Sequence, residues 1–353
     1  MGMLPDATFW KDKRVLLTGH TGFKGAWLSV MLEALGAQVT GISLAPETQP
    51  SMWQLLQLPM ASHLQDIREQ AAFAALVQRA QPQIAIHMAA QPLVRRSYAQ
   101  PVETFDTNIM GTVYLLEALR NMPALEAVLV ITSDKVYDNR ETRQAFDEQH
   151  PLGGSDPYSA SKAAAEMVVR SYATSFYAAA QVPVGSARAG NVIGGGDWSE
   201  DRLIPDMWRA YVAGEKLSLR HPEAVRPWQH ALDPLSGYLL YAEQMAQKKT
   251  LPPALNFGPA PEEILTVRDV ADRFAAILGS DALWVQGTPD ATRKESGYLS
   301  IDPAQAHAQL GWQPRLAPQE ALEWTGQWYM AHTRGDDMLQ VTRAQLARYG
   351  ALA

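Results

Sequence analysis

The sequence contains no cysteine, so it can form neither a disulfide bond nor a thiolate metal site. Its eight histidines show no His-x-x-x-His or comparable ligand spacing, which argues against metal-dependent catalysis. No apolar run approaches the roughly 20 residues that a membrane-spanning helix requires. Residues 1–13 also lack the apolar core of a signal peptide. These absences predict a cytoplasmic protein without a membrane segment or a metal ion.

Positive charge is also scarce, because 30 lysine and arginine residues stand against 37 acidic ones and give a net charge of −7. This balance argues against a nucleic-acid or anionic-membrane partner, although a local arginine pocket for an anionic substrate remains compatible with it. The chain has 353 residues, of which 47% are hydrophobic, and can bury one large core or two smaller ones. We expect one or two closely packed domains.

Three glycines, Gly19, Gly22 and Gly25, end an apolar run and precede helix-forming sequence. This pattern predicts a strand, a glycine turn and a helix, the arrangement that binds a dinucleotide. Gly19 would permit the tight turn, Gly22 would let main chain approach a pyrophosphate, and Gly25 would let the helix pack closely. The free N–H groups at the helix start would face the phosphates. Glycines also cluster in ordinary turns, so this motif needs support from other residues.

Strand and helix patterns alternate from residue 14 to about residue 190, which predicts an α/β fold with a doubly wound, Rossmann-type parallel sheet of at least five strands. The predicted strands are Arg14–Thr18, Gln38–Ile42, Ile84–Ala90, Ala127–Thr132 and Val182–Arg188, and the predicted helices are Ala26–Leu35, Ala71–Ala80, Pro101–Arg120 and Tyr158–Tyr177. We expect residues 1–190 to form a cofactor-binding domain that also holds the catalytic residues. Residues 191–353 would form a smaller, mixed α/β substrate-binding domain with segments that return to the sheet.

The end of the second strand bears on the cofactor, because an acidic residue there normally binds the adenosine ribose of NAD. Ser43 occupies this position, and Glu47 lies slightly too far along the chain. NAD is nevertheless favoured over NADP, since no lysine or arginine lies between Lys24 and Arg68 to bind a 2′-phosphate. Asp66, after a presumed third strand, could bind the adenine amino group, or it could equally cap the helix that follows.

Side chains typical of catalysis occur at two places in the sequence. Ser133, Asp134 and Lys135 follow a buried strand, at the edge where doubly wound sheets place their active sites. Tyr158 and Lys162 lie four residues apart and share one face of a helix. Lys162 could lower the pKa of Tyr158, whose phenolate could then take a proton from a substrate hydroxyl beside a nicotinamide. Alone, such a pair is commonly a solvated helix surface, but the glycine turn favours catalysis.

Over nearly its full length the sequence resembles the extended short-chain dehydrogenase/reductase superfamily. The matching motifs are Thr18-Gly19-His-Thr-Gly22-Phe-Lys-Gly25, Ala89-Ala90-Gln91, Asn108 with Gly111-Thr112, Ser133, Tyr158-x-x-x-Lys162 and Arg188-x-Gly190-Asn191. More narrowly, Gly-His-Thr-Gly-Phe-Lys-Gly-Ala-Trp-Leu, Thr-Ser-Asp-Lys-Val-Tyr and Arg226-Pro-Trp-Gln-His are similar to the CDP-glucose branch of the sugar-nucleotide 4,6-dehydratases. Most other members of that group carry Asp-Glu where this chain has Asp134-Lys135.

The resemblance implies a hydro-lyase that uses NAD catalytically. Tyr158 would take the C4 hydroxyl proton as hydride passes to NAD, with Ser133 holding the oxygen and Lys162 supporting the phenolate. Asp134 would then protonate the departing C6 hydroxyl, and Lys135 would remove the C5 proton. That role of Lys135 requires a pKa lowered by Lys162, by the nicotinamide charge and by burial. Hydride finally returns to C6, so the net reaction is loss of water.

The motifs and the resemblance together indicate which residues bind the ligands. The cofactor would contact Gly19, Thr21, Gly22, Phe23, Lys24, Gly25, Ser43, Asp66, Ile67, Ala89, Ala90, Gln91, Asn108, Tyr158 and Lys162. The nucleotide-sugar substrate would contact Asn191, Arg202, Arg226 and Arg293. Trp198 or Trp228 could stack on the base, although a core position is favoured for each. The choice of cytidine as the base depends on the resemblance alone.

Two other functions are weighed against this one. A nucleotide-sugar 4-epimerase on the same fold would return hydride to C4 without eliminating water, and Asp134-Lys135 argues against it. A non-catalytic dinucleotide-binding regulator is a second alternative. Such a protein would have no reason to keep Ser133, Tyr158 and Lys162 together with the glycine turn.

The predicted helices Pro101–Arg120 and Tyr158–Tyr177 carry apolar residues beyond one face. Examples are Val113, Leu116, Met167, Val168 and Tyr172. Two such helices could pair with their copies in a four-helix interface, as the superfamily commonly does. We therefore expect a homodimer or a dimer of dimers.

Overall fold

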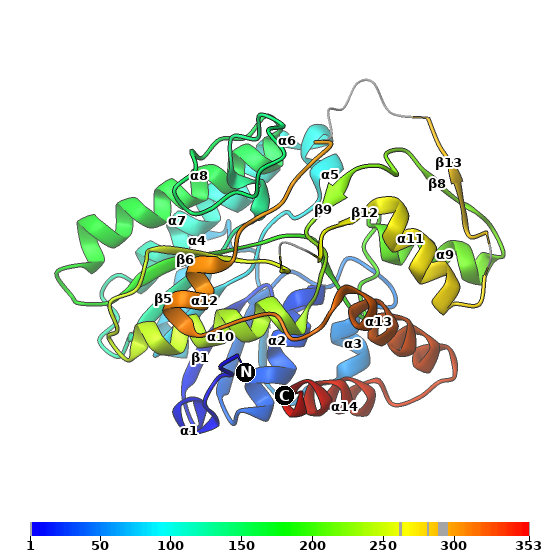
Figure 1. The fold of residues 1–353 in the computed structure, drawn as a ribbon. Coiled ribbons are helices and arrows are strands. Elements are labelled where there is room, and N and C mark those ends of the chain that lie inside the picture. Colours follow the sequence, from blue (N-terminus) through cyan, green and yellow to red (C-terminus); the bar gives the residue numbers. More distant parts are fainter. Residues whose placement is uncertain (1, 261–262, 281, 289–295, 353) are drawn as a thin grey trace.

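The computed structural model describes residues 2–260, 263–280, 282–288 and 296–352. Its centre is a seven-stranded sheet in the order β11-β6-β5-β4-β1-β2-β3, and every neighbouring pair is parallel (Figure 1). These strands are β1 (Arg14–Thr18), β2 (Gln38–Ser43), β3 (Ala61–Leu64), β4 (Ile84–His87), β5 (Ala127–Ile131), β6 (Val184–Ala189) and β11 (Ala254–Phe257). The predicted doubly wound parallel sheet is confirmed.

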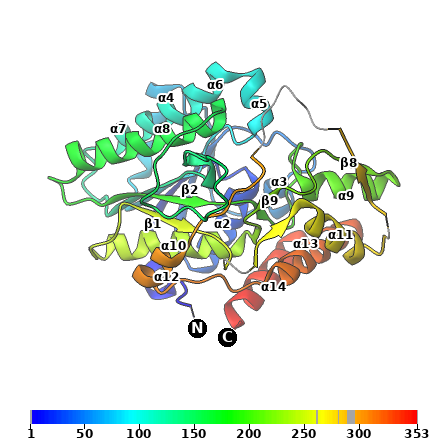
Figure 2. The same cartoon turned by 45° about the horizontal axis from the view of Figure 1, so that its top comes forward.

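Helices cover both faces of the sheet (Figures 1 and 2). On one face lie α4 (Gln70–Ala80), α7 (Gly111–Leu119) and α8 (Pro157–Tyr172), and on the other lie α2 (Phe23–Ala34), α10 (Leu232–Ala246) and α12 (Ala304–Leu310). Side chains alternate between the faces, since Val128 and Val130 of β5 pack with the first set of helices and Leu129 with the second. Both faces are therefore hydrophobic, as a parallel sheet requires.

The strand predicted to run from Ile84 to Ala90 ends at His87, so residues 88–91 leave the sheet. The N–H of Met88 still donates to the Thr18 carbonyl of β1 at 3.2 Å, and side chains provide further acceptors for this segment. The Thr18 hydroxyl accepts from the N–H groups of Met88 and Ala89 at 3.1 and 3.2 Å. Residues 88–91 are thereby free to line the space above the sheet.

Two predicted long helices contain π-helical segments that periodicity did not reveal. The Pro101–Arg120 pattern divides into α6 (Pro101–Phe105), the π-helix η1 (Asp106–Met110) and α7. The Tyr158–Tyr177 pattern ends in the π-helix η3 (Ala173–Tyr177). Wide turns of this kind are frequent near functional sites, and η1 contains Asn108.

The second half of the chain both completes the sheet and builds a lobe beside it. The lobe contains α9 (Leu203–Ala213), α11 (Val267–Ile277), α13 (Pro318–Thr333) and α14 (Met338–Ala351), with the strand pairs β7 (Val192–Ile193) and β10 (Gln229–His230), β9 (Val225–Arg226) and β12 (Leu265–Thr266), and β8 (Leu217–Leu219) and β13 (Trp284–Gln286). One hydrophobic cluster joins Trp27 of α2 to Trp324 and Trp328 of α13. Packing is thus continuous across the division proposed at residue 190.

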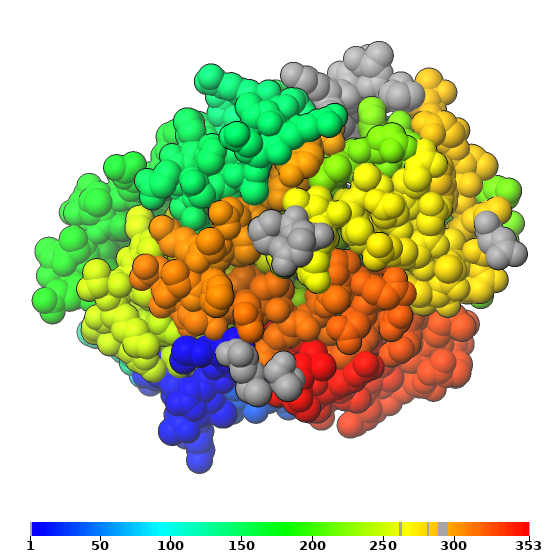
Figure 3. Space-filling view, viewed as in Figure 1, coloured from blue at the N-terminus to red at the C-terminus, as the bar shows by residue number. Residues whose placement is uncertain are grey.

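The remaining short elements are α1 (Ala7–Trp10), α3 (Met52–Leu56), α5 (Val94–Ala99) and the 3₁₀ turn η2 (Asp134–Val136). The N-terminal segment, blue in Figure 3, lies against the orange segment near residue 311, where the Met3 N–H donates to the Gly311 carbonyl at 2.8 Å. Arg315 joins both chain ends, since its guanidinium donates to the carbonyls of Gly2 and Leu352 at 2.7 and 2.5 Å. None of the helices in the described ranges is long and apolar enough to cross a membrane.

Candidate active site

A cleft of about 1370 Å³ lies at the carboxyl ends of the parallel strands. Its walls come from the glycine turn after β1, the loops after β2 and β4, the segment after β5, the start of α8, and residues 189–206 and 217–228. This is the edge at which parallel α/β sheets bind their ligands. Within the described residues, no group of three or more histidine, aspartate or glutamate side chains is arranged to hold a metal ion.

The glycine turn forms a cradle of bare main chain. Gly19 has a φ of +79°, a conformation that glycine adopts without strain. A Cβ atom on Gly25 would lie 2.1 Å from the Gly19 carbonyl oxygen, so a side chain there would displace the turn. Gly22 is the N-cap of α2, which starts at Phe23 rather than at the predicted Ala26. The first N–H groups of the helix are therefore open to the cleft, and the cradle fits a dinucleotide diphosphate.

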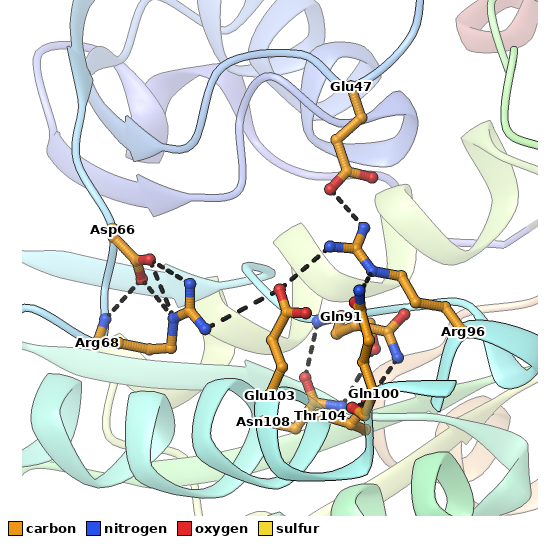
Figure 4. Close-up of polar contacts among 9 residues, drawn as sticks. All are labelled: Glu47, Asp66, Arg68, Gln91, Arg96, Gln100, Glu103, Thr104 and Asn108. Carbon is orange, nitrogen blue, oxygen red and sulfur yellow. Dashed lines mark hydrogen bonds and ion pairs between the residues drawn. The ribbon is translucent and has the colours of Figure 1, made fainter. Parts of the chain in front are cut away.

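Asn108 does not line the cleft but supports the segment that does. Its side chain is 2% exposed, its Oδ1 accepts from the Gln91 N–H at 2.8 Å, and its Nδ2 donates to the Gln91 carbonyl at 3.1 Å (Figure 4). Nδ2 also donates to the Ser161 hydroxyl at 2.8 Å. Ala89, Ala90 and Gln91 do line the cleft. Asn108 is thus placed to hold residues 89–91 against α8 rather than to touch a cofactor.

Ser43, at the end of β2, is buried and lies beside the glycine turn. Its hydroxyl is 2.7 Å from the Thr21 hydroxyl, which donates to the Leu44 carbonyl at 2.8 Å. Ser43 and Thr21 both line the cleft, together with Phe23 and Lys24. The Ser43–Thr21 hydrogen bond joins the glycine turn to the loop after β2. Neither side chain provides the negative charge that usually binds a ribose hydroxyl.

Asp66 has its carboxylate occupied by a neighbouring arginine. Oδ1 accepts from the Arg68 N–H at 2.9 Å and Oδ2 accepts from its Nη2 at 2.6 Å, and these bonds lower the pKa of Asp66. Helix α4 has Glu69 as its N-cap, so the alternative in which Asp66 caps this helix is wrong. Ile67 lines the cleft and packs on Gly111. A Cβ atom added to Gly111 would lie 2.4 Å from Cδ1 of Ile67.

Ser133, Asp134 and Lys135 form one hydrogen-bonded group after β5. The Ser133 hydroxyl donates to Asp134 Oδ1 at 2.9 Å, and Lys135 Nζ lies 3.2 Å from the same oxygen. Lys135 Nζ is also 3.4 Å from Asn191 Oδ1. Asp134 is 1% exposed, and its Oδ2 has no hydrogen-bond partner among the described residues. The Lys135 side chain is 28% exposed, so the expected burial is only partial.

Tyr158 lies in the same cleft, and burial raises its pKa to about 12. A hydrogen bond with Ser133 and the charge of Arg202 oppose this rise, while the charge of Asp134 adds to it. Lys162 is not among the groups with the largest effects on this pKa. The expectation that Lys162 lowers the pKa of Tyr158 stays a prediction, while Ser133 and Arg202 oppose the rise caused by burial.

Lys162 and Glu166 lie one turn apart on α8, and both bind the end of β5. Lys162 Nζ donates to the Ile131 carbonyl at 3.1 Å, and Glu166 accepts from the Thr132 hydroxyl at 2.5 Å. Burial lowers the pKa of Lys162 to about 8, and the charge of Glu166 opposes this shift. Glu166 also forms a buried ion pair with Arg188 at 2.8 Å. These contacts fix the main chain immediately before the serine.

Lys24 brings a further amine to the floor of the cleft. Its Nζ donates to the Tyr238 hydroxyl at 3.1 Å and lies 5.1 Å from the centre of that ring. Burial lowers the pKa of Lys24 to about 7, the positive charges of Lys162 and Arg202 lower it further, and the charge of Asp134 opposes them. Because the side chain still reaches water in the open cleft, the cost to stability is smaller than full burial would impose.

Replacing this lysine should stabilise the protein in a pH-dependent way. Folding moves the pKa of Lys24 from 10.5 to about 7, so the unfolded chain binds the proton more tightly. Stability then rises with pH across that window. We expect Lys24→Met to raise the melting temperature by a few degrees near pH 7, and the gain should shrink toward the upper end of the window. Thermal unfolding without nucleotide measures this, with the exposed Lys11→Met as control. A gain that is constant with pH would contradict the assignment.

Asn191, Arg202 and Arg226 all line the cleft. Arg202 Nη1 donates to Asp197 at 2.8 Å, which holds its guanidinium at the cleft wall. The positions of these three residues agree with a phosphate-binding role, which stays a prediction. Arg293 lies outside the described residues.

Trp198 and Trp228 combine core packing with a place at the cleft. Trp228 is 6% exposed, and Trp198 packs edge-on against Tyr329 with ring centres 5.2 Å apart. Both tryptophans line the cleft. The two alternatives weighed from the sequence, a core position and a surface for a base, are therefore compatible.

Sequence reasoning missed two ion pairs at the cleft. Helix α5 carries Arg95 and Arg96, which pair with Asp201 and Glu47 at 2.7 Å each. All four residues line the cleft. The sequence could have indicated these side chains, because α5 follows the Ala89–Gln91 segment and therefore lies at the carboxyl edge of the sheet.

A parallel sheet that places a glycine cradle beside serine, tyrosine and lysine defines an extended short-chain dehydrogenase/reductase. The Asp134 carboxylate and the Lys135 amine, which follow the serine, are groups that simple oxidation does not need. The chain belongs to the GDP-mannose 4,6 dehydratase family, whose model matches residues 16–325.

Individual relatives agree with this assignment. The chain is 44% identical to the CDP-glucose 4,6-dehydratase of Salmonella typhimurium over 352 residues, which covers 98% of each chain. Among solved structures, the UDP-glucose 4-epimerase of Thermotoga maritima aligns with a TM-score of 0.80 and 21% identity, covering 90% of this chain and 99% of that one. The dTDP-glucose 4,6-dehydratase of Bacillus anthracis, in complex with NAD, aligns at 0.73 and 24% identity, covering 92% and 99%.

Proposed function

We propose that this protein is an NAD-dependent nucleotide-sugar 4,6-dehydratase that converts CDP-glucose to CDP-4-keto-6-deoxyglucose. The observation that carries the proposal is the placement of Ser133, Asp134, Lys135 and Tyr158 in one cleft, because this set provides separate groups for oxidation and for elimination. The 44% identity to a CDP-glucose 4,6-dehydratase supports the choice of substrate. The glycine cradle, together with the NAD complex of a dehydratase of the same fold, supports the cofactor.

The first step needs a base at the sugar C4 hydroxyl. Bound NAD would supply a hydride acceptor for C4 and later a hydride donor for C6. Tyr158 takes the hydroxyl proton, and Ser133, which shares a hydrogen bond with it, holds the same oxygen. Lys162 has a pKa of about 8 and therefore remains mostly protonated at neutral pH, and its Nζ, which donates to the Ile131 carbonyl at 3.1 Å, would add positive charge at the end of β5.

The second step removes a proton from C5 and the hydroxyl from C6. The C4 ketone acidifies C5, Lys135 takes that proton, and Asp134 gives a proton to the departing hydroxyl. Lys135 must first lose its own extra proton, and Asp134, 3.2 Å away, is placed to accept it. This single transfer converts the ion pair into a neutral amine and a neutral acid, the two forms that the elimination requires. The Oδ2 atom of Asp134 is buried and has no hydrogen-bond partner among the described residues, and we assign it the proton transfer to the C6 hydroxyl.

One assay tests the function. Purified protein is incubated with NAD and, separately, with the CDP, dTDP, GDP and UDP derivatives of glucose, and the products are weighed by mass spectrometry. We expect loss of one water, fastest with CDP-glucose. A product of unchanged mass but altered configuration at C4 would indicate an epimerase, and no product from any substrate would indicate a non-catalytic protein.

We propose that two copies associate through α6, η1 and α8, and that the enzyme works in the cytoplasm, the location favoured by a soluble nucleotide-sugar substrate. The prediction that Leu116 lies at the interface was wrong, since its side chain is fully buried between α7 and the sheet. The exposed apolar side chains of these elements are Val102, Phe105, Met110 and Met167. Their exposure supports a contact with a second copy.

Charges on this face should separate the dimer. We expect Val102→Glu combined with Met167→Glu to leave a 38.8 kDa species, because two carboxylates would be buried at a symmetric contact. Sedimentation velocity at micromolar concentration measures this. Val212→Glu, at an apolar position of α9 that is 65% exposed, is the control and should leave the assembly unchanged. A parent protein that sediments only as the 38.8 kDa species would rule out the dimer.

A further inference from the structure

Five charged side chains form a continuous network on one wall of the cleft, shown in Figure 4. Arg96 is at its centre, with Nη1 2.7 Å from Glu47 and Nη2 3.1 Å from Glu103. Glu103 lies 3.9 Å from Arg68, whose guanidinium donates to Asp66 at 2.6 Å. The network therefore alternates in charge from the loop after β2, through α5 and α6, to the loop after β3.

The network begins in the loop after β2, the part of a Rossmann fold that generally binds the adenosine ribose. Glu47 lies beyond Ser43, slightly too far along the chain to be the acid at the end of β2, yet its carboxylate reaches Arg96 of α5 at 2.7 Å. Glu47, Arg96 and Glu103 line the cleft with Ser43, the residue that ends β2. The loop after β2 thus brings a carboxylate back to the region that Ser43 leaves without charge.

The same network occupies both arginines that could bind a 2′-phosphate. Arg96 uses all three guanidinium nitrogens, since Nε donates to Gln100 at 2.9 Å while Nη1 and Nη2 bind the two glutamates. Three carboxylates face two guanidinium groups, so the network has a net charge of −1. A 2′-phosphate binds through an arginine fork, and this wall offers it none that is uncompensated.

We infer that Glu47 and Glu103, by neutralising Arg96 and Arg68, make the adenosine end of the cleft select NAD against NADP. The inference rests on the dinucleotide site of the proposed function and adds to it the residues that decide the cofactor. The sequence favoured NAD because the loop after the second strand lacks lysine and arginine. The structure instead places two arginines in this network and neutralises both with carboxylates. The side chain of Glu47 is 56% exposed, so moderate, salt-dependent effects are expected.

Equilibrium binding to the full-length protein tests this without turnover. Dissociation constants for NAD and for NADP are measured by calorimetry at low ionic strength. In Glu47→Gln the amide keeps the shape and can still accept from Nη1 of Arg96, but it removes the negative charge that neutralises the guanidinium. A charge-assisted hydrogen bond from Arg96 to a phosphate should then strengthen NADP binding about tenfold. NAD binding should change by less than about threefold, and the gain for NADP should shrink as salt is added.

Two controls separate this role from others. Adding Arg96→Met to Glu47→Gln should restore the parent preference, because the guanidinium that lacks a neutralising carboxylate is then absent. Glu33→Gln breaks a surface ion pair with Arg343 outside the cleft and should leave both constants unchanged. Equal changes for NAD and NADP in Glu47→Gln would mean that Glu47 and Arg96 only close the cleft, and would overturn the inference. If the parent binds neither dinucleotide, the proposed function fails as well.

Discussion

Tyr158→Phe should abolish oxidation of the sugar at C4 while leaving the fold and cofactor binding intact. Only a hydroxyl is lost, and the main-chain N–H of Tyr158, which donates to the Ser97 hydroxyl at 3.2 Å, is unaffected. Removal of a general base costs on the order of 10²–10⁴ in rate. The appearance of reduced cofactor in a single turnover measures the step, and calorimetric binding of NAD shows that the site is preserved.

The matched control is Tyr172→Phe, on the same helix. Its hydroxyl is 3.4 Å from Glu117, and it does not line the cleft, so this variant should react at the parent rate. The pH dependence provides a second test. The pKa of Tyr158 is raised to about 12, so the fraction of phenolate, and with it the parent rate of oxidation, should rise with pH through the neutral range. If Tyr158→Phe kept the parent rate and pH profile, another group would be the base.

Lys135→Met should separate the two halves of the reaction. Ser133, Tyr158 and Lys162, which serve oxidation, are untouched, so reduced cofactor should form at close to the parent rate. Loss of the C5 base should then stall the cycle at the 4-keto sugar and slow product formation by on the order of 10²–10⁴. Stopped-flow absorbance follows the cofactor, and exchange of the C5 proton with deuterated solvent follows the base.

Other roles for Lys135 give other results. If the amine only binds phosphate or braces Asp134, its loss should weaken substrate binding or slow both steps together. Lys162→Met is the comparison variant, because it should slow the first step. Rapid C5 exchange in Lys135→Met would show that water or another group removes that proton, and the role of Lys135 as base would be abandoned.

The sequence by itself determined the features of this protein that depend on residues close together along the chain. The turn from Gly19 to Gly25 requires glycine at fixed spacing, and short continuous apolar runs define β1, β4 and β5. Tyr158 and Lys162 share a helix face because of their spacing, and Ser133 follows a buried strand that must end at the cleft edge. The fold class, the cleft and the central reactive groups were predictable because each follows from local geometry.

Tertiary structure alone decided how side chains distant in the sequence meet. The sequence does not show that a π-helix places Asn108 behind Gln91, because one extra residue in a turn changes no composition. It does not show that Lys24 meets Tyr238 of α10. Nor does it show that Glu47 meets Arg96, since the contact joins the loop after β2 to helix α5, which follows β4. Periodicity encodes which face of an element is buried, whereas the charges that meet across a cleft are fixed only when the elements pack.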